Sequence, residues 1–177
     1  MRSVVIYESM YGNTHLIAGA IADGLRAASE VAVVPLHGAD DELIAGADLV
    51  VVGGPTHVHG MSRESTRKSA VEVAEKPDSD PALDPDAEGE GLREGFDALS
   101  GASGGTAAAA FDTRMHGPTA ITGRASKGIA KRLRAHGFEL VADPESFIVT
   151  KENHLEDHEV EHAKEWGTRL LAAVTSK

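Results

Sequence analysis

The segment from Val4 to Ile21 constrains the fold of this chain more than any other. Residues 4–7 are apolar and either β-branched or aromatic, which is typical of a strand buried on both faces. Residues 8–14 then form a loop in which Gly12 and Asn13 suit tightly turned backbone. Beyond this loop, apolar residues recur at helical spacing: Leu16, Ile17, Ala20, Ile21 and Leu25. The segment therefore predicts a strand, a loop (the first loop, residues 8–14) and a helix.

The first loop suits an anion. The N-terminus of a helix presents unpaired N–H groups and the positive end of the helix dipole. Ser9 and Thr14 add hydroxyl donors, and the residues between them include no carboxylate. These properties fit a phosphate group. The alternative is an ordinary strand-to-helix turn with a capped helix, because such turns are common.

Strands and helices alternate along the rest of the chain. Apolar runs predict strands at residues 31–34, 48–53, 106–111, 138–141 and 146–149, the last two forming one strand interrupted by Asp143-Pro144. Helical patterns lie at residues 39–47, 62–74, 92–99, from 122 or 126 to 136, and 156–174. This alternation indicates a parallel α/β sheet, in which ligands lie at the carboxyl ends of the strands.

The first segment resembles the signature of the flavodoxins and flavodoxin-like FMN proteins. The matching positions are Val5, Ile6, Tyr7, Ser9, Gly12, Thr14, Ala18 and Ile21. The resemblance implies a flavodoxin-like, doubly wound, five-stranded parallel sheet in the order 2-1-3-4-5, with helices on both faces. It also implies FMN as the cofactor. By the same resemblance, the FMN 5′-phosphate is bound by residues of the first loop: Ser9, Met10, Tyr11, Gly12, Asn13 and Thr14.

A second loop, residues 53–62, follows the third predicted strand and reaches the same edge of the sheet. By the resemblance, it lines the isoalloxazine ring of the flavin. The residues concerned are Pro55, Thr56, His57, Val58, His59 and Gly60. Two alternatives stay open for the histidines. They are either exposed loop residues, or a His-x-His metal site that lacks a third ligand nearby.

A third loop, residues 112–118, follows the fourth predicted strand and is expected to close over the far side of the flavin. Its candidate residues are Asp112, Thr113, Arg114, Met115, His116 and Gly117. Flavodoxins usually stack the ring between a Trp and a Tyr, and neither the second nor the third loop contains one. Stacking then falls to His57, His59, Met115 or His116. We expect weaker flavin binding than in a classical flavodoxin, because an aromatic stacking contact contributes on the order of 1 kcal/mol.

Composition excludes several functions. The chain has 177 residues, the size of one domain, with 17 Lys+Arg against 28 Asp+Glu and a formal charge of −11. Such a charge argues against nucleic acid or an anionic membrane as a partner. Without cysteine, the chain has no disulfides, thiolate metal sites or iron–sulfur clusters. No leader or membrane-length apolar stretch is evident, so we expect a cytoplasmic protein.

The single predicted domain, residues 1–177, carries an acidic insertion at about residues 75–91. This insertion has three prolines, seven acidic residues and almost nothing to bury, which predicts a solvated segment. A docking arm for a basic partner is the alternative interpretation.

Residues 158–162 read His-Glu-Val-Glu-His and match the HExxH pattern of zinc proteases. The surrounding acidic residues predict a polar outer face on a terminal helix rather than a catalytic cleft. We therefore interpret these histidines, with His154, as exposed residues capable of adventitious metal binding.

The leading functional hypothesis is an FMN-binding electron-transfer protein that serves a redox partner protein or a small-molecule acceptor. One alternative is an NAD(P)H-dependent FMN quinone reductase, in which Arg114 or His116 lies near flavin N1 and stabilises the reduced anion. A second alternative is a flavin-free binding or regulatory module on the same fold, with the acidic insertion as its working surface.

Overall fold

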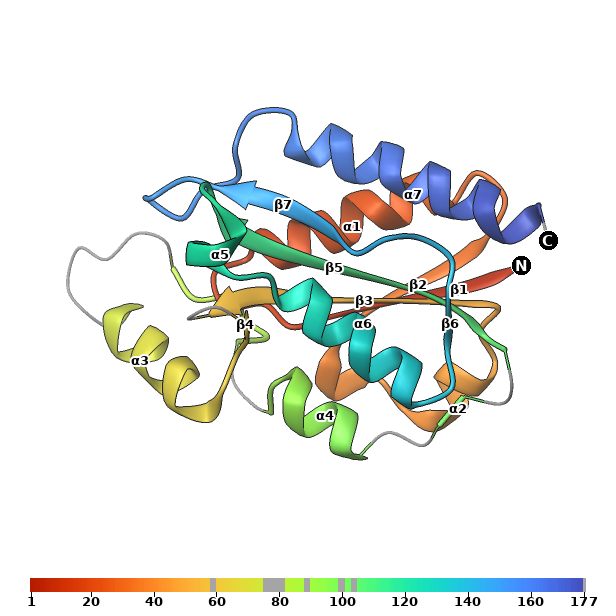
Figure 1. Cartoon of the computed structure of the whole chain (residues 1–177), viewed down its shortest axis with the longest axis horizontal. Coiled ribbons are helices and arrows are strands. Elements are labelled where there is room, and N and C mark those ends of the chain that lie inside the picture. Colours follow the sequence, from red (N-terminus) through yellow and green to blue (C-terminus); the bar gives the residue numbers. More distant parts are fainter. Residues whose placement is uncertain (58–59, 75–81, 88–89, 99–100, 103–104, 177) are drawn as a thin grey trace.

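The computed structural model describes residues 1–57, 60–74, 82–87, 90–98, 101–102 and 105–176. Figure 1 shows an open sheet with helices above and below it. No helix in these ranges combines the length and the apolarity that crossing a bilayer requires.

The sheet is built around β1 (Arg2–Tyr7), which pairs in parallel with β2 (Glu30–Pro35) and β3 (Leu49–His57). On the other side of β3 lies β5 (Ala107–Met115), also parallel. Both β6 (Glu139–Leu140) and β7 (Glu145–Val149) pair with β5, at different heights along it. The predicted order 2-1-3-4-5 is confirmed, because β6 and β7 together form the split fifth strand.

The helices divide between the two faces of this sheet (Figure 1). One face is covered by α1 (Asn13–Leu25) and α7 (Glu159–Thr175). The opposite face is covered by α2 (Asp41–Ala45), α4 (Leu92–Ala98) and α6 (Ala125–Ala135). The remaining elements are a 3-10 turn, η1 (Leu36–Gly38), a short strand, β4 (Gly60–Met61), and helices α3 (Glu64–Ala74) and α5 (Thr119–Thr122).

Each strand contributes alternate side chains to two separate cores. Val5 and Val51 pack toward α1 and α7, together with Phe111, Phe147 and Trp166. The residues next to Val5 and Val51 in the two strands pack toward the helices on the other face of the sheet. They are Val4, Ile6, Val50 and Val52. Because side chains alternate along a strand, burial on both faces requires the uninterrupted apolar runs seen in the sequence.

Helices α1 and α7 approach so closely that only glycine fits at their crossing. A Cβ added at Gly24 would lie 2.1 Å from the carbonyl oxygen of Lys164, and one at Gly167 would lie 2.3 Å from that of Ile21. The first helix is therefore held against the last one by near backbone contact.

The structure corrects three expectations. Strand β5 continues to Met115 because β7 pairs with residues 111–115, so the third loop begins within a strand. Helix α7 begins at Glu159 rather than near Glu156, because His158 adopts a left-handed conformation with φ 70°. The acidic insertion is not wholly solvated, since Asp84 and Ala87 are buried. Residues 75–81 and 88–89 of this insertion lie outside the described residues.

Candidate functional site at the carboxyl edge of the sheet

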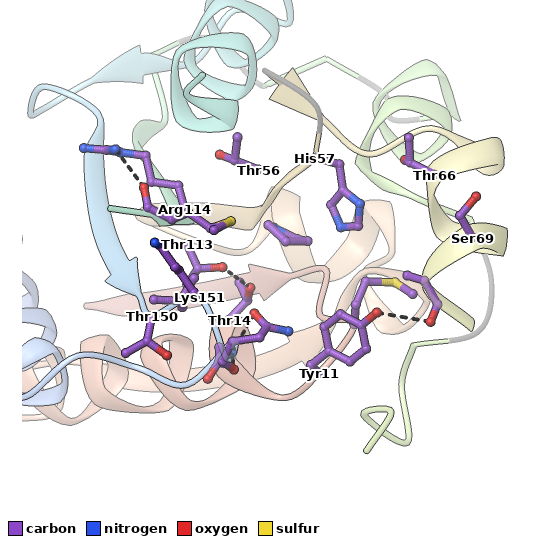
Figure 2. Close-up of a pocket in the computed structure, with 17 residues that line it drawn as sticks. Tyr11, Thr14, Thr56, His57, Thr66, Ser69, Thr113, Arg114, Thr150 and Lys151 are labelled. Atoms are coloured by element: carbon purple, nitrogen blue, oxygen red, sulfur yellow. Dashed lines mark hydrogen bonds between the residues drawn. The ribbon is translucent and has the colours of Figure 1, made fainter. Parts of the chain in front are cut away.

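A cleft of about 450 Å³ opens where the carboxyl ends of β1, β3, β5 and β7 and the segments after them converge. Figure 2 shows its side chains arranged around a central space, with His57 pointing into it and Tyr11 on the opposite side. The volume lies in the range typical of small-molecule sites. Ten of the residues expected from the sequence line it: Met10, Tyr11, Asn13, Thr14, Pro55, Thr56, His57, Thr113, Arg114 and Met115.

Other expected residues do not line this cleft. They are Ser9, Gly12, Gly60, Asp112, His116 and Gly117. Val58 and His59 lie outside the described residues. The side chain of His116 is 78% exposed, and its Nδ1 lies 3.5 Å from Glu156 Oε1. The imidazole of His116 is therefore directed to the surface.

The first loop holds its shape through its own hydrogen bonds. Gly12 adopts φ 86°, a left-handed conformation that favours glycine, and the buried Ser9 hydroxyl accepts a hydrogen bond from its N–H at 3.1 Å. Helix α1 then begins at Asn13 without a side-chain cap and without an acidic residue in its first turn. The first N–H groups of such a helix lack intrahelical partners. This end of the cleft can therefore accept an anion.

Hydrogen bonds tie the first loop to distant parts of the cleft. The hydroxyl of Thr14 lies 2.8 Å from the hydroxyl of Thr113 at the end of β5. The side-chain amide of Asn13 donates to the carbonyl oxygen of Asn153 at 2.7 Å. The start of α1 is thus positioned by both β5 and the turn after β7.

Asp112 does not line the cleft, but its hydrogen bonds hold neighbouring residues in place. Its fully buried carboxylate accepts hydrogen bonds from the Ser126 N–H at 2.7 Å and from the Thr56 hydroxyl at 3.2 Å. The Thr56 hydroxyl also accepts a hydrogen bond from the Ala125 N–H at 2.9 Å. Asp112 and Thr56 therefore cap α6 from neighbouring strands and fix the second loop against β5.

His57 and Tyr11 provide the aromatic surface of the cleft. Burial, with a smaller contribution from the Arg67 charge, lowers the pKa of His57 and favours its neutral form. The Tyr11 hydroxyl donates to the carbonyl oxygen of Ala70 at 3.1 Å, which holds the ring against α3. Met115, at 49% exposure, lies on the outer side.

Seven lining residues were not expected from the sequence: Thr66, Ser69, Ala70, Val149, Thr150, Lys151 and Asn153. Those of α3 approach the cleft because β4 folds back on the end of β3, and no sequence signal indicates that short antiparallel pairing. The lining residues after β7 could have been predicted from the sequence, because the carboxyl ends of all parallel strands meet at one edge of the sheet.

Arg114 is held rigidly beside the cleft. One terminal nitrogen of its guanidinium donates to the carbonyl oxygens of Met115 and Gly117, at 3.2 and 3.0 Å, and to the Thr122 hydroxyl at 3.1 Å. These bonds leave its positive charge without a carboxylate partner among the contacts described for it. Together with Lys151, it gives the lining two positive charges, and no acidic side chain lines the cleft among the residues that the structure describes.

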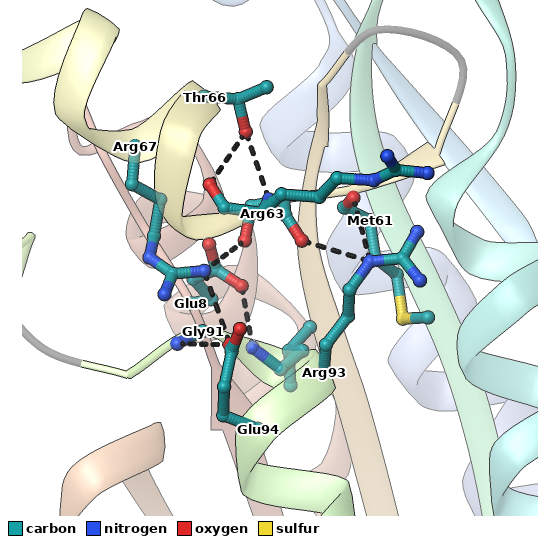
Figure 3. A network of polar contacts seen from close by, with 10 residues as sticks. Glu8, Met61, Arg63, Thr66, Arg67, Gly91, Arg93 and Glu94 are labelled. Atoms are coloured by element: carbon teal, nitrogen blue, oxygen red, sulfur yellow. Dashed lines mark hydrogen bonds and ion pairs between the residues drawn. The ribbon is translucent and has the colours of Figure 1, made fainter.

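A polar network fixes the far end of the second loop (Figure 3). The Glu8 carboxylate accepts from the Leu92 N–H at 2.8 Å, and burial raises its pKa. Arg67 donates to the Ser62 hydroxyl at 3.2 Å and lies 3.3 Å from the Glu94 carboxylate. The Arg93 Nε donates to the Ser62 carbonyl oxygen at 3.1 Å. The network joins β1, β4, α3 and α4 behind the cleft.

The HExxH pattern does not place its two histidines on one helix face. His158 precedes α7 in a left-handed conformation, and Nδ1 of His162 lies 3.1 Å from Glu159. Since i and i+4 positions share a face only within a helix, His158 and His162 do not form the paired geometry of a zinc-protease HExxH motif.

The fold and the cleft define a flavodoxin-like α/β protein whose cleft, lined by Arg114 and Lys151 among others, lies at the switch point of the sheet. The family model described as "Flavodoxin" matches residues 5–166, and the chain belongs to the flavodoxin family. Membership of this family implies a flavin cofactor. Curated protein sequences include no match to the chain.

Solved structures of similar fold cover the whole chain. A flavodoxin from the domain Archaea is 20% identical with a TM-score of 0.67, over 99% of both chains. Flavodoxin 1 from Bacillus cereus is 21% identical with a TM-score of 0.65, over 97% of this chain and 98% of that one. A WrbA-like flavodoxin from Agrobacterium tumefaciens is 15% identical with a TM-score of 0.60, over 99% and 98%. At these identities the likeness supports the shared fold alone.

Proposed function

We propose that this chain is an FMN-binding electron-transfer protein. The observation that carries the proposal is the charge of the cleft. In a chain with a formal charge of −11, the described residues that line the cleft include two cations and no carboxylate, and the cleft adjoins the uncapped N-terminus of α1. Such a site selects an anionic ligand.

The residues present fit FMN. The backbone N–H groups at the start of α1 and the Thr14 hydroxyl would bind the phosphate, as the anion geometry of the first loop suggests. His57, Pro55 and Met115 would contact the ring, since they also line the cleft and lie at the ends of β3 and β5. FMN, when bound, supplies reversible electron transfer, while the protein binds it, orients it and limits its contact with water.

Ring contacts are expected to be modest. Tyr11 and His57 are the aromatic side chains of the lining, and the Tyr11 hydroxyl is already bonded to α3. A single imidazole face stabilises a stacked ring by about 1 kcal/mol. We therefore expect FMN affinity to depend chiefly on the phosphate end.

The decisive experiment compares FMN with riboflavin, which lacks the phosphate. Purified protein is titrated with each ligand and followed by flavin fluorescence. We expect stoichiometric FMN binding and a riboflavin affinity at least about tenfold weaker, the scale of one lost charge-assisted contact. Equal affinity would contradict the phosphate assignment. No flavin binding at all would leave a flavin-free module on this fold.

Arg114 favours a second candidate, an NAD(P)H-dependent quinone reductase. Its fixed charge beside the cleft would stabilise a reduced, anionic flavin and so favour two-electron chemistry. Steady-state assays with NADH or NADPH and a quinone separate the candidates. Turnover supports the reductase, whereas no turnover with either donor leaves the carrier.

The electron acceptor is proposed to be a basic partner protein or a small molecule that reaches the outer side of the cleft near Met115, which is 49% exposed. The formal charge of −11 would accelerate association with a basic partner. Electron-transfer rates that fall steeply with ionic strength would support a basic protein, while salt-independent rates would favour an uncharged small molecule.

A further inference from the structure

We infer that His15, Asp84 and Asp86, joined by His37, form a binding site for a divalent transition-metal ion, with Zn²⁺ as the representative ion. The site lies beside α1 and outside the cleft described above. Ligand atoms of His15, Asp84 and Asp86 all lie within 4.8 Å of one another. The inference is independent of the proposed flavin function.

The distances suit a small metal ion. Neighbouring ligand atoms around a tetrahedral Zn²⁺ lie roughly 3.3 to 3.6 Å apart, given bonds of about 2.0–2.2 Å. Nδ1 of His15 lies 3.3 Å from Oδ2 of Asp84, which matches this spacing. Nε2 of His37 lies 3.9 Å from Oδ1 of Asp86, which is longer than this spacing and makes His37 the weaker fourth ligand. Two imidazole nitrogens and two carboxylate oxygens are ligands that Zn²⁺ and its neighbours accept.

The carboxylates are already oriented by other groups. Oδ1 of Asp84 accepts a hydrogen bond from the Asp86 N–H at 2.9 Å, which leaves its Oδ2 directed toward His15. Oδ2 of Asp86 accepts from the Tyr7 hydroxyl at 2.9 Å, which leaves its Oδ1 toward His37. Such outer partners commonly fix the ligands of metal sites.

The imidazole of His15 is also held in place. Its ring stacks on Tyr7 with 4.5 Å between centroids and 18° between planes. His15 is 47% exposed at the side chain, whereas the Asp84 side chain is 2% exposed. A metal ion can therefore enter from solvent on the His15 side and meet a buried carboxylate behind it.

Charge provides a second, independent reason. Asp84 and Asp86 are adjacent carboxylates, and within the described ranges the ion pairs of both are with histidines rather than with Lys or Arg. A buried carboxylate without a permanent cation is costly. A divalent ion would neutralise both charges and join residues 82–87 to His15 of α1 and His37 of η1.

The test measures Zn²⁺ binding to the full-length chain after treatment with a chelator, by isothermal titration calorimetry, with Co²⁺ absorption as a probe of coordination. We expect one ion per chain. His15→Gln and Asp84→Asn should each weaken the Zn²⁺ affinity by at least about tenfold, and His37→Gln should weaken it by a few-fold. His15→Gln changes a half-exposed side chain, so it should fold even if Asp84→Asn does not.

The matched control is the double variant His158→Gln/His162→Gln, which removes the competing histidines of the HExxH pattern. We expect its Zn²⁺ affinity to stay within about twofold of wild type. Loss of binding in this control, unchanged binding in His15→Gln, or no saturable binding in wild type would each overturn the inference. In the last case His15 and Asp84 form a hydrogen bond only.

Discussion

The hydroxyl of Thr14 lies 2.8 Å from the hydroxyl of Thr113, a residue 99 positions further along the chain. This hydrogen bond joins the first loop to the end of β5, and both threonines are buried. The two halves of the cleft are therefore coupled at the point where α1 begins.

Thr113→Val tests how much this hydrogen bond contributes to stability and to FMN binding. Valine matches threonine in shape but leaves the buried Thr14 hydroxyl without this partner, so the free energy of unfolding should fall by about 1–3 kcal/mol. FMN affinity should fall as well, because Thr14 would lose its fixed position. Urea denaturation and FMN titration measure both effects. Thr168→Val, an exposed position on α7, is the control and should change neither by much.

Lys151→Gln tests the electrostatic contribution of the turn after β7. Because Lys151 is an exposed cation on the lining of the cleft, its removal should weaken FMN binding by about two- to fivefold at low salt and less at high salt. The control is Lys164→Gln, an exposed lysine on α7 that does not line the cleft. Equal losses in both variants would indicate a general effect of net charge.

Glu8→Gln should change how stability depends on pH. Burial raises the pKa of Glu8 above its ordinary value of 4.5, so the folded chain keeps a proton that the unfolded chain releases. The stability that this proton supplies is present below the unfolded pKa and is lost as pH rises through the folded one. Glutamine does not titrate, so the stability of the variant relative to wild type should rise with pH. Parallel stability curves from urea denaturation would contradict this assignment.

Asp84→Asn should strengthen FMN binding, if the phosphate occupies the first loop. A Cβ built on Gly12 would lie 3.7 Å from Oδ2 of Asp84, so this carboxylate lies beside the first loop although it does not line the cleft. Removing its charge should increase FMN affinity by about three- to tenfold at low salt. Asp23→Asn, about 15 Å further along α1, is the control. Bound Zn²⁺ in wild type should act in the same direction as the substitution.

Local patterns predicted most of the fold. Continuous apolar runs identified the buried strands, and the interruption at Asp143-Pro144 correctly predicted that the fifth strand is split into β6 and β7. Strand order came from the family resemblance rather than from the residues alone. The end of β5 was missed because its last residues are polar, and their strand conformation depends on pairing with β7.

The candidate site was predictable only in part. The sequence identified Met10, Tyr11, Asn13 and Thr14 because they follow β1, and Pro55 to His57 because they lie at the carboxyl end of β3. Thr66 and Ser69 were missed because their approach depends on β4, a pairing of two residues with no recognisable pattern. The proximity of Asp84 to Gly12 was missed because it joins residues far apart in the sequence through an insertion that composition marked as solvated.

The glycine crossing of α1 and α7 has a consequence for biosynthesis. Helix α7 is translated after every other described element, and the buried face of α1, including Ile17 and Ile21, shares a core with Trp166 and Leu170 of α7. This buried face of α1 therefore completes its packing only once α7 has left the ribosome and docked. We therefore expect full ligand affinity only in chains that have completed α7, and weaker ligand binding by a nascent chain that stalls before it.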